Sequence, residues 1–240
     1  MGWLSALSER FRSQPGPGQA SEHRAALAAW KALPEAAHDL PHGRQRYVVV
    51  DVETSGLDMK RDRLIAIGAV AVQGGAIDFT DAFQVVLQQS EASSTENILI
   101  HGIGAGEQRD GVEPAAALLA FLDFVGKSPL VAYHAFFDEA MLAKAMRAHL
   151  GQVPGFFWLD LAWVLPELFP DFRRDGRVAL DDWLTYFGIE NIQRHNAVSD
   201  AYATACLLQI AGARGTARGS DSAAAFARIE KARRWLYESA

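Results

Sequence analysis

The hydrophobic pattern from Tyr47 onward begins with strand-like runs and continues with helical ones. Three apolar runs rich in β-branched residues predict strands at 47–50, 64–73 and 76–88. Gly74 and Gly75 lie between the second and third runs and supply the positive φ of a tight turn, so we expect an antiparallel hairpin there. Residues 47–50 are apolar throughout, which is typical of a strand buried on both faces, and we expect this strand at the centre of the sheet.

Short strands alternate with helices in the second half of the chain. Apolar runs at 129–133 and 156–160 predict two further strands. Helical spacing of the apolar residues predicts helices at 114–125, with Pro114 in the first turn, and at 136–150, 161–169, 180–187 and 197–210. A hairpin followed by alternating strands and helices predicts an α/β domain with a mixed five-stranded sheet and flanking helices.

The first 43 residues differ from this domain. Apolar residues recur at helical spacing at Trp3, Leu4, Leu7 and Phe11, then at 21–33 after a QPGPG break at 14–18. We interpret 1–43 as a helical appendage or arm. Its apolar stripe packs on the main domain, binds a protein partner or touches a membrane surface, and packing is the simplest of these alternatives.

The end of the chain also carries a break in pattern. Residues 214–221 are rich in Gly, Arg and Ser and predict a linker, and 222–237 predict a last amphipathic helix. The expected organisation is an arm at 1–43, a catalytic domain at 44–212, and a linker with a C-terminal helix at 213–240.

Composition and charge limit the classes of function. With 240 residues, half of them hydrophobic, the chain can bury one sizeable core. A net charge of −6 argues against a basic protein that coats nucleic acid, although an enzyme that meets phosphates through bound metal ions needs no basic surface. The single cysteine, Cys206, excludes an internal disulfide framework and fits a reducing compartment. No apolar run reaches the ~18 residues of a membrane span and no signal-peptide pattern occurs, so we expect a cytoplasmic protein with no membrane span.

Two carboxylates end the first predicted strand. Asp51 and Glu53 are two residues apart, so their side chains leave on the same face if the strand continues through them. Two anions beside an apolar core are costly unless a positive charge lies between them. A hard cation such as Mg²⁺ or Mn²⁺ supplies that charge, because it binds carboxylate oxygens and keeps positions for water and phosphate. Taken alone, the pair also fits a strand end with solvated acids.

Two further acids lie at the starts of predicted helices. Asp138 is in the first turn of the helix at 136–150, at the carboxyl edge of the sheet, where open α/β folds place their ligands. Asp200 is near the start of an otherwise apolar helix, where an unpaired acid is costly. Each alone also fits an acid that interacts with the helix macrodipole. Together with Asp51 and Glu53 they predict a cluster that two cations about 4 Å apart bridge, as in two-metal hydrolysis of a phosphodiester.

Three sequence blocks carry a family resemblance. The blocks DVETSGL at 51–57, HAFFDEAML at 134–142 and HNAVSDA at 195–201 resemble, in order and separation, the motifs of the DnaQ-like (DEDDh) 3′–5′ exonucleases. His195 stands five residues before Asp200, as in that class, whereas the sister DEDDy class has a tyrosine. The resemblance covers about 47–210 and implies a ribonuclease H-like fold.

This resemblance implies a role for each acid and for the histidine. Asp51, Glu53 and Asp200 would ligate one metal ion, with Asp51 shared by a second, and Asp138 would act largely through metal-bound water. His195 would be the general base, since an imidazole titrates close to neutral pH. The implied reaction uses two divalent cations, Mg²⁺ or Mn²⁺, and releases nucleoside 5′-monophosphates from a single-stranded 3′ end of DNA or RNA.

The resemblance also implies contacts with the substrate. Thr54 would contact the terminal nucleotide through its main chain and hydroxyl group, and Leu57 would wedge against the base. His101 and Ile103 belong to an IHGI segment that is similar to the family's HGI element. We expect these four residues to bind substrate.

One position departs from the family pattern. Relatives commonly have His-Asn-Ala in the second motif, where this chain has Tyr133, His134 and Ala135. His134 is able to become cationic or bind a metal, so it changes the expected substrate contacts and leaves the metal ligands unaffected. Other acids, including Asp58 and Asp62, are interpreted as solvated turns or caps.

The sequence alone leaves open the role of one basic stretch and the choice between three functions. Arg173, Arg174 and Arg177 either follow a nucleic-acid backbone or form a solvated loop.

A free-standing exonuclease is the first interpretation of the function. A proofreading subunit of a DNA polymerase is the alternative, although only about thirty residues follow Ile210 to bind a polymerase. A catalytically inactive nucleic-acid binding module is the third, and the complete set of acids and the histidine argues against it.

Overall fold

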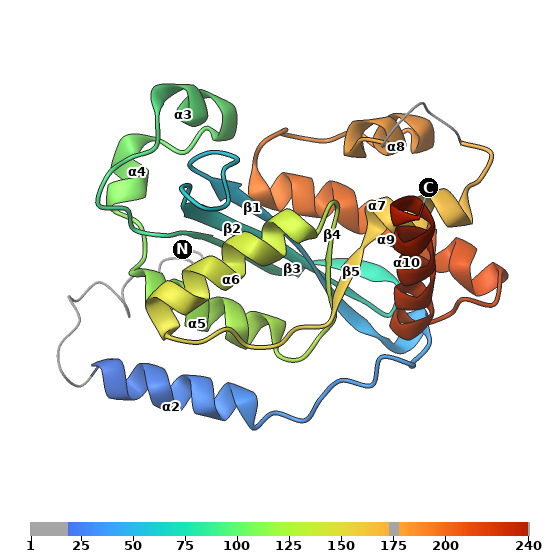
Figure 1. Ribbon diagram of the computed structural model, residues 1–240, viewed down its shortest axis with the longest axis horizontal. Coiled ribbons are helices and arrows are strands. Elements are labelled where there is room, and N and C mark those ends of the chain that lie inside the picture. Colours follow the sequence, from blue (N-terminus) through green and yellow to red (C-terminus); the bar gives the residue numbers. More distant parts are fainter. Residues whose placement is uncertain (1–18, 173–177, 240) are drawn as a thin grey trace.

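The computed structural model describes residues 19–172 and 178–239. Its sheet has five strands in the order β3-β2-β1-β4-β5 (Figure 1). They are β1 (Arg46–Thr54), β2 (Leu64–Gln73), β3 (Ala76–Val86), β4 (Leu130–Ala132) and β5 (Trp158–Asp160). β1 pairs antiparallel with β2 and parallel with β4, which makes the sheet mixed and confirms β1 as its central strand.

The hairpin of β2 and β3 has the predicted turn. Gly74 and Gly75 have φ of 61° and 78°, and Val72 pairs with Ile77 across the turn. β3 ends at Val86, two residues before the predicted end, because the main-chain N–H of Gln88 bonds Val112 rather than β2. The strand therefore stops where the chain changes its hydrogen-bond partner.

Nine α-helices surround this sheet in the part of the chain that is described. They are α2 (Gln19–Lys31), α3 (Thr95–His101), α4 (Ala105–Arg109), α5 (Pro114–Val125), α6 (Phe136–Leu150), α7 (Leu161–Leu168), α8 (Leu180–Phe187), α9 (Ala197–Ala217) and α10 (Ala223–Glu238). The helices α5 and α6 cover one face of the sheet and α9 the other (Figure 1). This arrangement confirms the mixed α/β fold.

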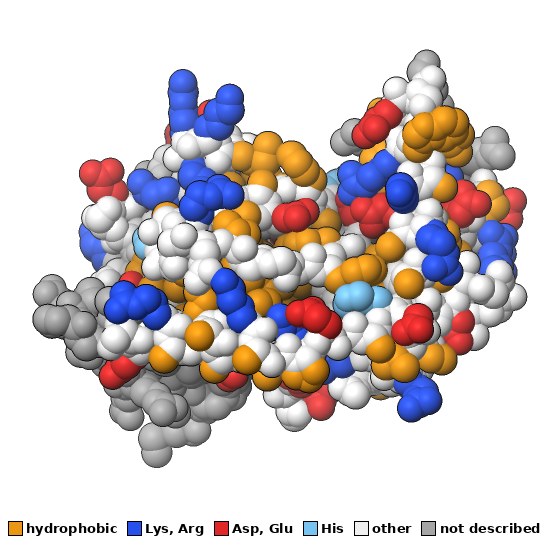
Figure 2. All heavy atoms as spheres, turned by 60° about the horizontal axis from the view of Figure 1, so that its bottom comes forward, with side chains coloured by type: hydrophobic (Ala, Val, Ile, Leu, Met, Phe, Trp, Pro, Cys, Tyr) orange, Lys and Arg blue, Asp and Glu red, His pale blue; other side chains and the backbone are white. Residues whose placement is uncertain are grey.

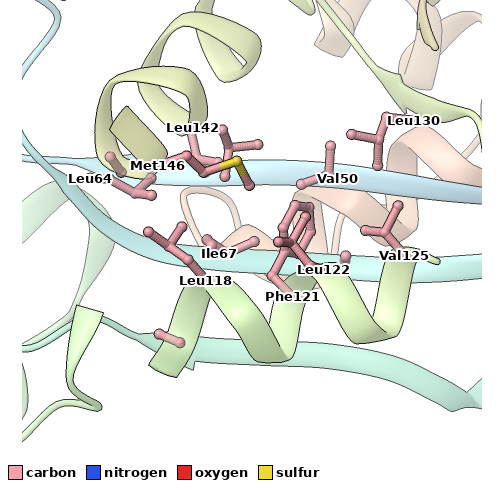
Figure 3. Packing of buried hydrophobic residues seen from close by; sticks show 14 of the residues in the cluster. Val50, Leu64, Ile67, Leu118, Phe121, Leu122, Val125, Leu130, Leu142 and Met146 are labelled. Carbon is pink, nitrogen blue, oxygen red and sulfur yellow. The ribbon is translucent and has the colours of Figure 1, made fainter. Parts of the chain in front are cut away.

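Alternate residues of β1 face two separate cores. Val48 and Val50 pack with α5 and α6, while Tyr47 and Val49 pack with α7 to α10. Figure 3 shows the first core, in which Phe121 of α5 lies beside Val50 and Ile67 of the sheet. An apolar run without alternation is therefore explained by burial on both faces.

The end of α9 corrects the prediction of a linker. The sequence predicted that this helix ends at Ile210 and that a linker covers 214–221, whereas α9 continues to Ala217. Its glycines serve close packing: a Cβ added at Gly215 would lie 2.6 Å from the ring of Phe226 and 2.7 Å from the Ser220 carbonyl oxygen. The short connection to α10 therefore packs directly on α9.

The described part of the arm packs on the main domain. Leu27 and Trp30 of α2 are buried in the core that contains α5, and the Trp30 ring lies 5.6 Å from that of Phe156. The predicted helical pattern that begins at Trp3 lies outside the described residues, as do residues 173–177 of the basic stretch. Within the described residues, no helix is both long enough and apolar enough to cross a membrane.

Candidate active site

The acidic residues of β1 lie where α9 comes closest to the sheet. Asp51 and Glu53 are both within β1, opposite Gly68 and Ala66 of β2, so the strand does continue through them. A Cβ added at Gly68 would lie 2.3 Å from main-chain atoms of Ala197 and Val198. Only glycine leaves room for the start of α9 at this point, and this close approach brings Asp200 to Asp51.

Three carboxylates meet at the carboxyl end of β1. One oxygen from each of Asp51, Glu53 and Asp200 lies within 4.8 Å of the other two. Asp200 is only 5% exposed, and the other two are half-buried. Figure 2 shows acidic, basic and hydrophobic side chains around a hollow of the molecular surface.

The fourth acid, Asp138, is buried in the first turn of α6. It is not one of the three residues whose oxygens meet within 4.8 Å. Its charge nevertheless acts on the cluster, because burial raises the pKa of Asp51 and the charge of Asp138 raises it further. The structure therefore brings the four predicted acids to one region: three have carboxylate oxygens within 4.8 Å of one another, and Asp138 is near enough for its charge to raise the pKa of Asp51.

Burial and mutual repulsion make these acids hard to ionise together. Burial raises the pKa of Asp138 to about 8, although the main-chain N–H groups of Asp138 and Val52 lower it. Burial and the charge of Asp200 raise the pKa of Glu53 to about 7, while Arg194 lowers it. Ionised carboxylates in such a site need added positive charge. The donor set consists of carboxylate oxygens, which fits hard divalent cations such as Mg²⁺ or Mn²⁺.

The segment before α9 holds Asp200 in place. The Arg194 side chain donates to Asp200 Oδ1 at 2.9 Å, and the main-chain N–H of His195 donates to Oδ2 at 2.9 Å. Asn191 also donates to Oδ1, and Asn196 caps the helix by accepting from the Ser199 N–H. Arg194 and Asn191 were not predicted from the sequence, because their spacing carries no motif of its own.

His195 and His134 have an unusual backbone. Within the described residues they are the two non-glycine residues with positive φ, at 59° and 62°. A carboxylate holds each of them: Asp200 accepts the N–H of His195, and Asp160 accepts the N–H of His134 at 2.9 Å. Such conformations cost about 1–3 kcal/mol and cluster at functional sites. Both imidazoles are exposed, which leaves them accessible to a substrate.

The predicted substrate contacts fall into two groups. Leu57 is 86% exposed, whereas Thr54 is buried and its hydroxyl donates to the Gly56 carbonyl at 2.7 Å. His101 is 4% exposed, its Nε2 lies 3.2 Å from Ser93 Oγ, and its Nδ1 accepts from the Ile103 N–H. The His101 ring therefore shapes the loop internally, and its direct contact with a substrate stays a prediction.

A family model described as exonuclease, of the RNase T type, matches residues 48–208. The PolC-type DNA polymerase III of Bacillus subtilis (strain 168) is 32% identical over 177 residues, which are 72% of this chain and 12% of that protein. The corresponding protein of Oceanobacillus iheyensis is 34% identical over 166 residues, 68% of this chain and 11% of that protein. The chain thus spans little more than a tenth of the length of these relatives.

Solved structures of nucleases have the same fold. Exonuclease I of E. coli in complex with a dT13 oligonucleotide has a TM-score of 0.62 at 19% identity and covers 72% of this chain and 42% of its own. The cell-death related nuclease 4 has a TM-score of 0.62 at 16% identity, with 71% and 65% covered. Since the family model covers residues 48–208, the chain belongs to the DnaQ-like exonuclease family of the ribonuclease H-like superfamily and is an exonuclease.

Proposed function

We propose that this exonuclease removes nucleotides from a 3′ end of DNA or RNA and releases nucleoside 5′-monophosphates. The observation that carries the proposal is the convergence of Asp51, Glu53 and Asp200 within 4.8 Å, with buried Asp138 beside them. These four residues would hold two Mg²⁺ or Mn²⁺ ions. Bound there, the ions supply the positive charge that acidifies water and neutralises the charge developing on the phosphate.

His195 is the proposed general base. His195 is exposed, and its main-chain N–H donates to the Asp200 carboxylate of the cluster. It accepts a proton from the water whose oxygen attacks phosphorus. The bond between phosphorus and the 3′ oxygen of the preceding nucleotide then breaks, so the shortened strand keeps a 3′ hydroxyl group and the released nucleotide keeps the phosphate.

The proposed substrate is a single-stranded terminus. Exonuclease I, which shares the fold, has been solved with a dT13 oligonucleotide, and this supports an extended single strand as the substrate. Leu57, with 86% of its side chain exposed, is placed to contact an unstacked base. A proofreading module is the second candidate, because the PolC-type polymerases are similar in sequence. We also propose a cytoplasmic location, consistent with the lone cysteine, Cys206.

Degradation of defined oligonucleotides tests this function. Matched DNA and RNA strands, single or duplex, with free or blocked 3′ ends, are incubated with Mg²⁺, Mn²⁺ or EDTA, and the products are identified by mass. We expect 5′-mononucleotides from free 3′ ends only, and none with EDTA. Binding without hydrolysis under every metal condition would contradict the proposal and favour an inactive binding module. Removal of a mismatched 3′ base from a duplex in preference to a matched one would favour proofreading.

A further inference from the structure

The loop between β1 and β2, residues 55–63, is closed on itself. The Ser55 N–H donates to the Arg63 carbonyl at 2.9 Å and joins its two ends. Inside the loop, the Asp62 carboxylate accepts from Ser55 Oγ at 2.9 Å and from the Asp58 N–H at 2.8 Å. A Cβ added at Gly56 would lie 2.4 Å from Asp62, so the loop is tightly packed around this carboxylate. Asp62 therefore organises the loop, beyond the solvated turn that the sequence suggested.

A lysine from another element fixes this loop on the domain. Lys144 Nζ, from α6, donates to the main-chain carbonyls of Met59, Lys60 and Asp62 at 3.1, 2.8 and 2.6 Å. An ammonium group has three N–H donors, so this loop uses all of them. Hydrogen bonds of a charged donor are stronger than neutral ones. The cross-link therefore holds the loop in one orientation relative to α6.

Both ends of this cross-link lead to the acidic cluster. The loop starts two residues after Glu53, and α6 carries Asp138 six residues, about 1.7 turns, before Lys144. The loop presents Leu57 to solvent with 86% of its side chain exposed. An apolar side chain held rigidly beside an acidic site is arranged to meet a flat apolar surface, such as a nucleobase, with little loss of conformational entropy.

We propose that Lys144 is a positioning residue for the substrate: its cross-link between α6 and loop 55–63 holds Leu57 against the base of the 3′-terminal nucleotide. This inference rests on the exonuclease function proposed above. Because Asp62 and the Ser55–Arg63 pair close the loop independently, loss of Lys144 releases the loop from α6 without opening it. The effect then falls on substrate binding, whereas the acids and His195 stay in place.

The test compares Lys144→Met with Lys144→Arg and with Lys127→Met. Lys127 is a matched control, since its Nζ also links two segments, through Glu35 at 2.8 Å, but away from the acids. With a single-stranded oligonucleotide and Mn²⁺, we expect Lys144→Met to raise KM about 3- to 10-fold, the cost of ordering a freed loop, with kcat changed less than twofold. Lys144→Arg should restore most of the affinity, and Lys127→Met should keep the wild-type KM.

A double-mutant cycle separates positioning from general stabilisation. If Lys144 acts through Leu57, then Lys144→Met should change KM little in a Leu57→Ala background. Fully multiplicative effects, a kcat loss with unchanged KM, or a wild-type KM in Lys144→Met would each overturn the inference. Thermal unfolding of every variant accompanies the kinetics, and circular dichroism verifies that each is folded. An inactive wild-type protein would refute the proposed function, whereas an active one with normal Lys144→Met kinetics would refute this inference alone.

Discussion

Two buried acidic sites lie at the same edge of the sheet. The described residues offset the negative charge fully at only one of them, the site of Asp160. Asp160, at the end of β5, is 2% exposed, and its carboxylate accepts from the N–H groups of His134 and Ala162 and from Arg234 at 3.1 Å. The cluster at the end of β1 has four acids, and within residues 19–172 and 178–239 Arg194 is the cation that pairs with it. Donors of the chain satisfy the carboxylate of Asp160, whereas the cluster at the end of β1 is the candidate site for divalent cations.

The neighbours of each acid explain this difference. Burial raises the pKa of both Asp160 and Asp51. At Asp160, the two N–H groups and Arg234 then lower it, whereas at Asp51 the charges of Asp138, Asp200 and Glu53 raise it further. The different neighbours therefore give a structural ion pair at Asp160 and a candidate metal site at Asp51.

The largest expected effect is on hydrolysis, and it comes from removing Asp51 from the acidic cluster at the end of β1. Asp51→Ala should abolish hydrolysis, by more than about 10³-fold, because in the proposed site Asp51 is the ligand that both cations share. Calorimetric titration with Mn²⁺ should show weaker binding, with single-turnover assays measuring the rate. Asp123→Ala, at an exposed position of α5, is the control for loss of an acid outside the cluster. Unchanged turnover in Asp51→Ala would refute the two-metal site.

The next effect concerns the base and leaves the acids intact. His195→Ala should lower the single-turnover rate about 10²- to 10⁴-fold, the usual contribution of general acid–base catalysis. Mn²⁺ affinity should stay near the wild-type value, since the imidazole is not one of the carboxylate ligands. A His134→Ala variant serves as the comparison, because its ring is also exposed. A larger loss of rate in His134→Ala than in His195→Ala would exchange their roles.

Short-range patterns in the sequence predicted much of this site. The uninterrupted apolar run at 47–50 placed β1 at the centre, and the motif spacing identified Asp51, Glu53, Asp138 and Asp200, which the fold brings to one region. The prediction of the central strand rests on local periodicity, and that of the four acids rests on blocks of a few residues. Such patterns can be recognised without any knowledge of tertiary contacts.

What the sequence did not predict depends on residues that are distant in the chain. Asp160 and Arg234 are 74 positions apart, and Lys144 is 82 positions from Asp62. The short helices α3 and α4 were also missed, and Gln108 of α4, fully buried, holds them by bonding Ser93 and Ile103. No periodicity marks such contacts, since each depends on how elements meet after folding.

The ion pair between Asp160 and Arg234 leads to a third prediction, which concerns stability. Arg234→Met should lower the free energy of unfolding by about 1–3 kcal/mol, because it leaves the Asp160 carboxylate buried without its cation. Arg233→Met is the matched control on the same helix, since its partner Glu167 is 55% exposed, and such a surface pair contributes about 0–1 kcal/mol. Urea denaturation measures both variants. Equal losses in the two would show that Asp160 does not depend on Arg234.

The smallest expected effect is a dependence of stability on pH, which arises from the raised pKa values in the acidic cluster. The folded protein raises the pKa of Glu53 to about 7 and that of Asp138 to about 8, above the values near 4 of the unfolded chain. Between those limits the folded state binds more protons than the unfolded state, so stability falls as pH rises. In EDTA, Tm should decrease on the order of 5 °C from pH 5 to pH 8. Asp138→Asn should flatten this slope, and Mn²⁺ at pH 8 should restore Tm. A Tm that rises with pH in EDTA would contradict the raised pKa values of Glu53 and Asp138.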